Sequence, residues 1–125
     1  MFHGSNIHVE GQLLINGTEE NPIQIIAHNY IENNRWGAIC FTNALDTSYI
    51  SYTKISGAST GINPSVHHGA ISSINSHLVI SHIEIDDVIF PIYVEDGSIS
   101  ISESVLSCDY ICDYINVKGL SLIHI

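Results

Sequence analysis

The chain has 125 residues, which is enough for one small domain or for a piece of a longer protein. Lysine and arginine total 3 against 13 aspartate and glutamate residues, giving a formal net charge of -10 at pH 7. Binding to nucleic acid or to an anionic membrane surface needs clustered Lys and Arg, so this composition excludes both as expected partners.

Membrane insertion is not expected, because no stretch reaches the roughly 18 consecutive apolar residues of a membrane span. The N-terminal residues, MFHGSNIHVEG, lack the basic and apolar regions of a signal peptide, and Met1 is compatible with an internal start. The cysteine count is odd, so we predict small buried apolar side chains at Cys40, Cys108 and Cys112 and no closed disulfide framework.

Short β-strands are predicted along the whole chain, because apolar and polar residues alternate and no window carries a helical stripe. The first segment, residues 7–18, has its aliphatic side chains mostly on one parity and ends at the turn residues Gly17 and Thr18. The next, residues 21–27, has Pro22 at the strand entrance. Residues 35–41, RWGAICF, follow as a third segment, in which we expect Ile39 and Phe41 to point inward.

A weak internal repeat follows in the segments 49–62, 79–92 and 100–113. Each contains an Ile-Ser pair, a second aliphatic residue five positions after that Ile, and a third apolar position near twelve. The pairs begin at Ile50, Ile80 and Ile101, so the intervals are 30 and 21 residues. The longer interval contains NPSVHHG at 63–69, which is typical of an inserted loop.

This repeat predicts a parallel β-solenoid, in which each coil buries a strip of Ile and Val by stacking on its neighbours about 4.8 Å away. The alternative is a β-sandwich, which needs hairpin turns between antiparallel strands, and Asn16-Gly17 is the one Asn-Gly dipeptide present. An exposed final coil would leave an unpaired edge, so we expect the isolated fragment to aggregate. The predicted inward strip is Ile7, Val9, Ile15, Ile23, Ile25, Ile39, Ile50, Ile55, Ile62, Ile71, Ile80, Ile85, Ile92, Ile101, Leu106 and Ile115.

The residues VEGQLLINGTEENPIQI resemble the opening coil of secreted right-handed parallel β-helix proteins of the pectate-lyase-like superfamily. RWGAICF is similar to the Trp-Gly-x-Ile-x-Phe step of the next coil, and SYISYTKISGASTGI is similar to the coil after it. The resemblance covers about residues 7–117 and is specific for the fold, not for an activity. It implies an all-β, right-handed parallel β-helix of about four to five coils, from a larger exported bacterial protein at the cell surface or outside the cell.

The last six residues, LSLIHI, break the coil pattern and match the translated end of a transposon adaptor used for sequencing libraries. We therefore predict that residues 1–119 are β-helix coils, incomplete at the C-terminus, and that residues 120–125 are adaptor read-through and not native. A natural strand that spells the same hexapeptide is the alternative.

The expected function is a non-catalytic extracellular scaffold or a surface that contacts a polysaccharide or cell-surface glycan. Lyases of the superfamily use an Arg or Lys base beside calcium, and its hydrolases combine Asp residues with Gly-His-Gly and Arg-x-Lys motifs. This chain has Arg35 as its one arginine, and the HHG at 67–69 matches only in part, so we predict no catalytic residue. The alternatives are a lyase or hydrolase whose catalytic coils lie beyond the fragment, and a protein-binding adhesin. Five aromatic residues are candidate glycan contacts: Trp36, Tyr49, Tyr52, Tyr93 and Tyr110.

Calcium is the one cofactor that the sequence suggests, with Asp86, Asp87, Asp109 and Asp113 as candidate ligands. Calcium takes about six to eight oxygen ligands, which adjacent coils could together supply, yet no Asp-x-Asp-x-Asp-Gly loop is present. Solvated loop carboxylates are the alternative. The 8 histidines are scattered, whereas zinc needs three or four convergent ligands, so we predict no zinc site.

Overall fold

The computed structural model describes residues 4–28, 35–59, 63, 68–108, 112–119 and 121–125. These residues form β-strands, turns and irregular segments, with no helix among them. The strands are β1 (Ile7–Val9), β2 (Leu14–Asn16), β3 (Ile23–Ile25), β4 (Ile39–Thr42), β5 (Ser48–Ser56), β6 (Ile71–Ile74), β7 (His77–Asp86), β8 (Ile92–Glu95), β9 (Ser98–Ser102), β10 (Val105–Leu106), β11 (Ile115–Lys118) and β12 (Leu122–His124).

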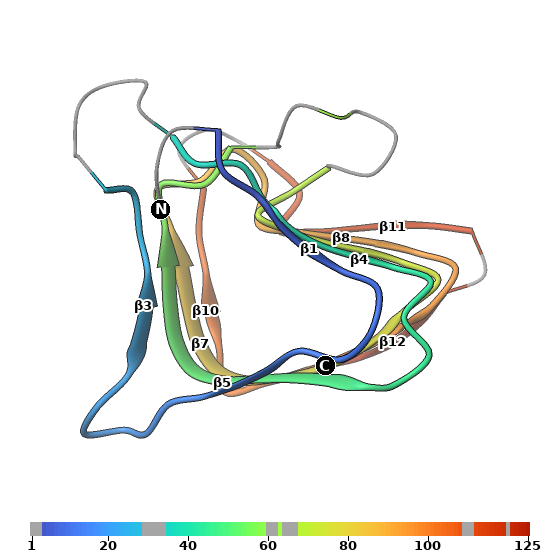
Figure 1. Cartoon of the computed structure of the whole chain (residues 1–125), viewed down its shortest axis with the longest axis horizontal. Coiled ribbons are helices and arrows are strands. Elements are labelled where there is room, and N and C mark those ends of the chain that lie inside the picture. Colours follow the sequence, from blue (N-terminus) through green and yellow to red (C-terminus); the bar gives the residue numbers. More distant parts are fainter. Residues whose placement is uncertain (1–3, 29–34, 60–62, 64–67, 109–111, 120) are drawn as a thin grey trace.

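The strands belong to two sheets, and the chain alternates between them (Figure 1). The first sheet has the order β1-β4-β6-β8-β11, and the second has the order β12-β9-β7-β5-β2, with β3 on β5 and β10 on β7. Every strand pair within the described residues is parallel. The predicted all-β class with parallel strands is therefore confirmed, and the β-sandwich alternative is wrong because it requires antiparallel hairpins.

The internal repeat found in the sequence sets the register of the second sheet. Ile50 pairs with Ile80, and Ile80 pairs with Ile101, so the three Ile-Ser pairs lie directly beside one another. The second repeat position aligns in the same way, with Ile85 between Ile55 and Leu106. The register predicted for these two positions is confirmed. At the third position, residues 62 and 111 lie outside the described residues.

The core is a column of aliphatic side chains between the sheets. Nine residues of the predicted strip are buried, and five more are partly buried and packed against them. Ile23 is the exception at 38% exposure, on a strand that has a neighbouring strand on one side only among the described strands. The buried members of the strip are Val9, Ile39, Ile50, Ile55, Ile71, Ile80, Ile85, Ile92 and Ile101, and the partly buried ones are Ile7, Ile15, Ile25, Leu106 and Ile115. The fully buried side chains that the strip omits include Trp36, Leu78, Val88 and Ile99.

Residues in the left-handed backbone region lie in register at the corners where the chain leaves a strand. Asn43, Asn75 and Asp96 follow three aligned strands of the first sheet, at φ values of 50, 47 and 50°. Asn75 Nδ2 donates a hydrogen bond to Asn43 Oδ1 at 2.9 Å. Asn and Asp tolerate this conformation well, so short polar residues at this corner allow the repeated turn.

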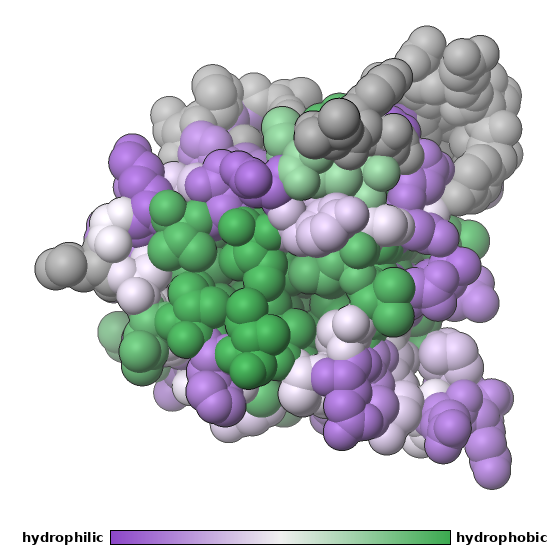
Figure 2. Space-filling view, turned by 180° about the vertical axis from the view of Figure 1, so that it is seen from behind, coloured by the Kyte–Doolittle hydropathy of each residue, from purple (hydrophilic) through white to green (hydrophobic). Residues whose placement is uncertain are grey.

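Apolar side chains remain exposed on the edge strands. Figure 2 shows a broad hydrophobic area, framed by hydrophilic side chains, on the face of the molecule behind the view of Figure 1. Val117 on β11 is 44% exposed, and Leu122 on β12 is 71% exposed. β12 lies within the predicted adaptor residues 120–125 and pairs in parallel with β9. The fold does not test whether these six residues are native, so their origin in an adaptor stays a prediction.

The cysteines differ from the prediction in two of three cases. Cys108 and Cys112 form a disulfide, with their Cα atoms 6.7 Å apart, so the prediction of two separate buried thiols is wrong. The odd number of cysteines did not indicate this pair. The third cysteine, Cys40, lies in the core on β4. Burial raises the pKa of the Cys40 thiol to about 12, and its hydrogen bond with Ser72 acts in the opposite direction.

Candidate functional site

A groove of about 570 Å³ lies on the outward face of the second sheet, where β3, β5, β7 and β10 run side by side. Its floor is formed by the second halves of β5 and β7, and the segment before β3 forms one wall. The groove combines an aromatic ring, charged groups and an amide. The lining residues are Thr18, Glu19, Pro22, Gln24, Tyr52, Thr53, Lys54, His82, Ile83, Glu84, Glu103 and Val105.

One row of groove residues crosses the four strands at the same register position. Gln24 pairs with Lys54, Lys54 with Glu84, and Glu84 with Val105. Lys54 Nζ lies 3.5 Å from Glu84 Oε1 and 3.7 Å from Asp86 Oδ2. Both ion pairs are substantially exposed, so they contribute little to stability.

A second row of groove residues lies at the corner where the second halves of β5 and β7 begin. Tyr52 and His82 stack with ring centroids 4.4 Å apart and an interplanar angle of 12°. His82 Nε2 lies 2.6 Å from Glu103 Oε2, so the row continues from the imidazole to a carboxylate. All three residues have positive φ values, of 47, 51 and 47°. We name Tyr52, His82 and Glu103 the corner column.

The left-handed conformation costs free energy for residues such as Tyr and Glu, and such outliers gather at binding and catalytic sites. The corner columns of the first sheet avoid this cost by using Asn, Asp and Gly, as at Asn43 and Gly119. The corner column therefore keeps large functional side chains at positions where short residues would be more stable. This contrast supports a role for the column beyond the fold.

Gly17 occupies the position before Tyr52 in the same column, since Asn16 pairs with Ser51 and Gly17 N donates to Ser51 O at 3.0 Å. A Cβ atom on Gly17 would lie 2.2 Å from the Tyr52 carbonyl oxygen, so no side chain fits there. Tyr52 is thus the first ring of the column. Its partly exposed side chain borders a wall that contains Thr18, whose Oγ1 accepts a hydrogen bond from Asn21 N.

The predicted glycan contacts occupy different environments. Tyr52 lies in the groove, and Tyr49 is 42% exposed on the outer face of β5, outside the groove lining. Trp36 is fully buried, and its Nε1 donates to the Ser56 carbonyl at 2.8 Å, so its ring has no face open to a ligand. Tyr110 lies outside the described residues.

Tyr93 is the remaining predicted contact, and it is only 7% exposed. The end of the predicted insertion covers it: the His68 ring lies 4.3 Å from the Tyr93 ring, and His68 N donates to Ser72 Oγ at 2.8 Å. Tyr93 Oη donates to Glu95 Oε2 at 2.9 Å. Burial raises the pKa of the Tyr93 hydroxyl to about 12, and the hydrogen bond and negative charge of Glu95 add to this shift.

The candidate calcium ligands that the structure describes have different surroundings. Asp86 pairs with Lys54, whereas Asp87 Oδ1 lies 3.0 Å from Arg35 Nη2. Asp113 is exposed, and residue 109 lies outside the described part of the chain. Among the described residues, no group of three or more His, Cys, Asp or Glu side chains could hold a metal ion.

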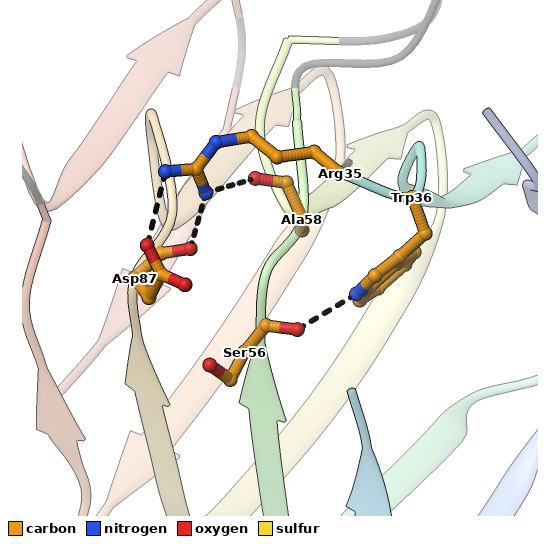
Figure 3. A network of polar contacts seen from close by, with 5 residues as sticks. All are labelled: Arg35, Trp36, Ser56, Ala58 and Asp87. Carbon is orange, nitrogen blue, oxygen red and sulfur yellow. Dashed lines mark hydrogen bonds and ion pairs between the residues drawn. The ribbon is translucent and has the colours of Figure 1, made fainter. Parts of the chain in front are cut away.

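Arg35 has a structural role beside the buried Trp36, as Figure 3 shows. Its Nη1 donates to the Ala58 carbonyl at 3.2 Å and also to the Asp87 carbonyl, and its Nη2 binds the Asp87 carboxylate. One guanidinium therefore bridges the residues that follow β5 and β7, at a corner rather than in the groove. These contacts stabilise the packing of neighbouring strands. They also hold Arg35 outside the groove.

Most of the groove residues were not singled out from the sequence, although the repeat contained the signal. Tyr52, His82 and Glu103 each follow directly after the repeated Ile-Ser pair. Aligning the three pairs would have placed these side chains in one column. Their conformation was not predictable in this way, because alternation in a strand indicates opposite faces and not a corner.

Comparisons with known proteins leave the family open: no family model, curated protein or solved structure matches the sequence. Among the described residues, no helix is long and apolar enough to cross a membrane. The groove and the parallel strand register are therefore the observations from which a function is inferred.

Proposed function

We propose that this chain is a segment of a right-handed parallel β-helix of the pectate-lyase-like superfamily, from an exported bacterial protein. The proposal is supported by the resemblance of residues 7–117 and by the in-register parallel pairing of the repeats. Stacked coils present aligned outward rows, which suit an extended polymer. The proposed role is a non-catalytic, extracellular scaffold whose groove contacts a polysaccharide.

The observation that carries this role is the partly exposed Tyr52 ring at the edge of a groove built from four strands. Aromatic faces stack on sugar rings, and carboxylate, amide and ammonium groups exchange hydrogen bonds with sugar hydroxyls. Gln24, Lys54 and Glu84 offer these three groups in one row beside the ring. The pairing of a stacking surface with polar groups is the arrangement that sugar binding requires.

Retention of the chain in native gels that contain soluble polysaccharides tests the proposal. We expect retention on at least one glycan, and we expect Tyr52→Ala to weaken it at least about fivefold, since an aromatic contact contributes about 1 kcal/mol beyond its buried area. Tyr114→Ala is the matched control, because Tyr114 is 53% exposed but lies outside the groove lining. Equal losses in both variants would contradict a specific role for the groove.

The same samples separate the proposal from its two alternatives. Release of unsaturated sugars that stops when a calcium chelator is added would assign the protein to the lyases and overturn the non-catalytic role. Absence of retention on every glycan would favour a protein-binding adhesin. Sequencing genomic DNA across the codon for Gly119 would show whether residues 120–125 belong to the natural protein.

A further inference from the structure

We infer that the groove selects neutral polysaccharides and rejects polyuronates, an inference that rests on the proposed glycan-binding function. The observation behind it is the charge of the lining. Three carboxylates, Glu19, Glu84 and Glu103, line the groove, whereas Lys54 is its one lysine and the lining contains no arginine. The chain as a whole has a formal net charge of -10.

The single ammonium group is already neutralised by protein carboxylates. Lys54 Nζ lies 3.5 Å from Glu84 Oε1 and 3.7 Å from Asp86 Oδ2, two carboxylates of the neighbouring strand β7. A uronate that approached Lys54 would have to compete with both. The carboxylate of Glu103 is directed to His82 Nε2 at 2.6 Å, and its side chain is still 72% exposed. Negative charge therefore remains open to solvent at the corner column.

Neutral sugars meet none of this repulsion. Ionised carboxylates only accept hydrogen bonds, and each hydroxyl of a neutral sugar can donate one, so Glu84 and Glu103 are suited to bind hydroxyl groups. Gln24 can both donate and accept, and Tyr52 offers a ring face. Both rows cross strands about 4.8 Å apart, so a polymer that lies along the rows meets several polar groups in succession: Gln24, Lys54 and Glu84 in one row, and Tyr52, His82 and Glu103 in the other.

The size of the selection follows from Coulomb's law. Two unit charges about 7 Å apart in water repel enough to weaken binding about threefold, and a polyuronate brings one charge per sugar past several groove carboxylates. Charge repulsion is screened by salt over about 10 Å at 0.1 M ionic strength, so the selection is strongest in dilute buffer. Stacking on Tyr52 depends much less on salt.

Affinity electrophoresis of the whole chain at low salt tests the inference with hydroxyethyl cellulose and galactomannan as neutral glycans, and polygalacturonate and alginate as acidic ones. We expect retention on a neutral glycan and at least tenfold weaker retention on both acidic ones. We expect Glu103→Gln to raise the ratio of acidic to neutral retention about threefold. Glu10→Gln makes the same change in net charge outside the groove lining and should leave the ratio unchanged.

The outcomes separate this inference from the function on which it rests. Stronger retention on polygalacturonate than on any neutral glycan would overturn the charge selection and leave glycan binding standing. The same ratio in the Glu103→Gln and Glu10→Gln variants would overturn the assignment of the selection to the groove. Absence of retention on every glycan would overturn the proposed function, and the charge selection with it.

Discussion

Tyr52 and His82 stack face to face from neighbouring strands, with centroids 4.4 Å apart, and both residues are in the left-handed backbone region. Their neighbours in sequence, Ser51 and Ser81, pair in register, which brings the two rings together. The strand spacing of about 4.8 Å is close to the distance at which aromatic rings stack. The parallel register thus stacks the rings of two successive repeats on one another.

This stacking predicts a measurable coupling between the two side chains. In a double-mutant cycle of Tyr52→Ala and His82→Ala, we expect the free energies of unfolding to deviate from additivity by about 0.5–1.5 kcal/mol. Urea denaturation of the four proteins measures it. The pair Tyr52→Ala and Tyr114→Ala, in which no stacking occurs between the described rings, should be additive within about 0.5 kcal/mol. Additivity in the first cycle would show that the stack does not contribute to stability.

Gly17 should not tolerate a side chain. Its added Cβ would lie 2.2 Å from the Tyr52 carbonyl oxygen and 2.9 Å from Ile23 N, both backbone atoms that cannot move independently. We expect Gly17→Ala to lower the free energy of unfolding by about 1–3 kcal/mol, the usual cost of overpacking. Gly11→Ala is the control, because nothing lies within 4 Å of its added Cβ. It should change stability by at most about 1 kcal/mol, and equal effects of the two substitutions would contradict the close approach.

The aliphatic column should dominate stability. Ile80 is fully buried between Ile50 and Ile101, so Ile80→Ala removes contacts with the repeats on both sides. We expect a loss of about 2–5 kcal/mol in urea denaturation. Val79→Ala changes the adjacent residue, which is 36% exposed on the outer face, and should cost less than about 1 kcal/mol. Similar losses in both variants would mean that the two faces of β7 are equally important.

The sequence predicted the register of the repeats because identical aliphatic residues stack only when the strands align. Ile50, Ile80 and Ile101 could be matched by their spacing to the following Ser, without knowing the lengths of the loops between them. The inward strip followed from the same pattern. The prediction for Ile23 was wrong: it is 38% exposed, whereas Ile25 on the same strand is partly buried, and alternation does not distinguish the two residues.

The candidate site was harder to predict because it depends on where the backbone turns and on which side chains are covered by loops. Tyr93 points outward by parity but is buried, because His68 folds over it from a loop that has no strand pattern. Trp36 was predicted to be a surface aromatic, yet its indole N–H reaches the Ser56 carbonyl inside the core. Tyr52 was found as one aromatic residue among five, whereas its partners His82 and Glu103 required the alignment of the repeats.

Arg35 should contribute more to stability than the exposed lysine on β11. Arg35→Met removes hydrogen bonds to two carbonyl groups and one carboxylate at a partly buried corner, and we expect a loss of about 1–3 kcal/mol. Lys118→Met removes one ion pair with Glu95 from a side chain that is 70% exposed, which should cost at most about 1 kcal/mol. Urea denaturation compares the two variants, and a larger loss in Lys118→Met would contradict the bridging role of Arg35.

Stability should fall at high pH because of Tyr93. The pKa of its hydroxyl is raised from 10.0 to about 12 in the folded state, chiefly by burial. Between these two values the unfolded chain releases the proton and the folded chain keeps it, so stability that is fully present below about pH 10 is lost as the pH rises toward 12. The loss approaches about 1.4 kcal/mol per pH unit within this window, and it is about 1 kcal/mol between pH 9 and pH 11.

The substitution Tyr93→Phe tests this dependence directly. At neutral pH it removes the hydrogen bond to Glu95, which should cost about 1 kcal/mol. Between pH 9 and pH 11, however, the variant should lose about 1 kcal/mol less stability than the parent chain, because the group that titrates is gone. Tyr114→Phe controls for a hydroxyl on a side chain that is 53% exposed and should follow the parent. Parallel stability curves for all three proteins would show that the Tyr93 hydroxyl titrates alike in the folded and unfolded states.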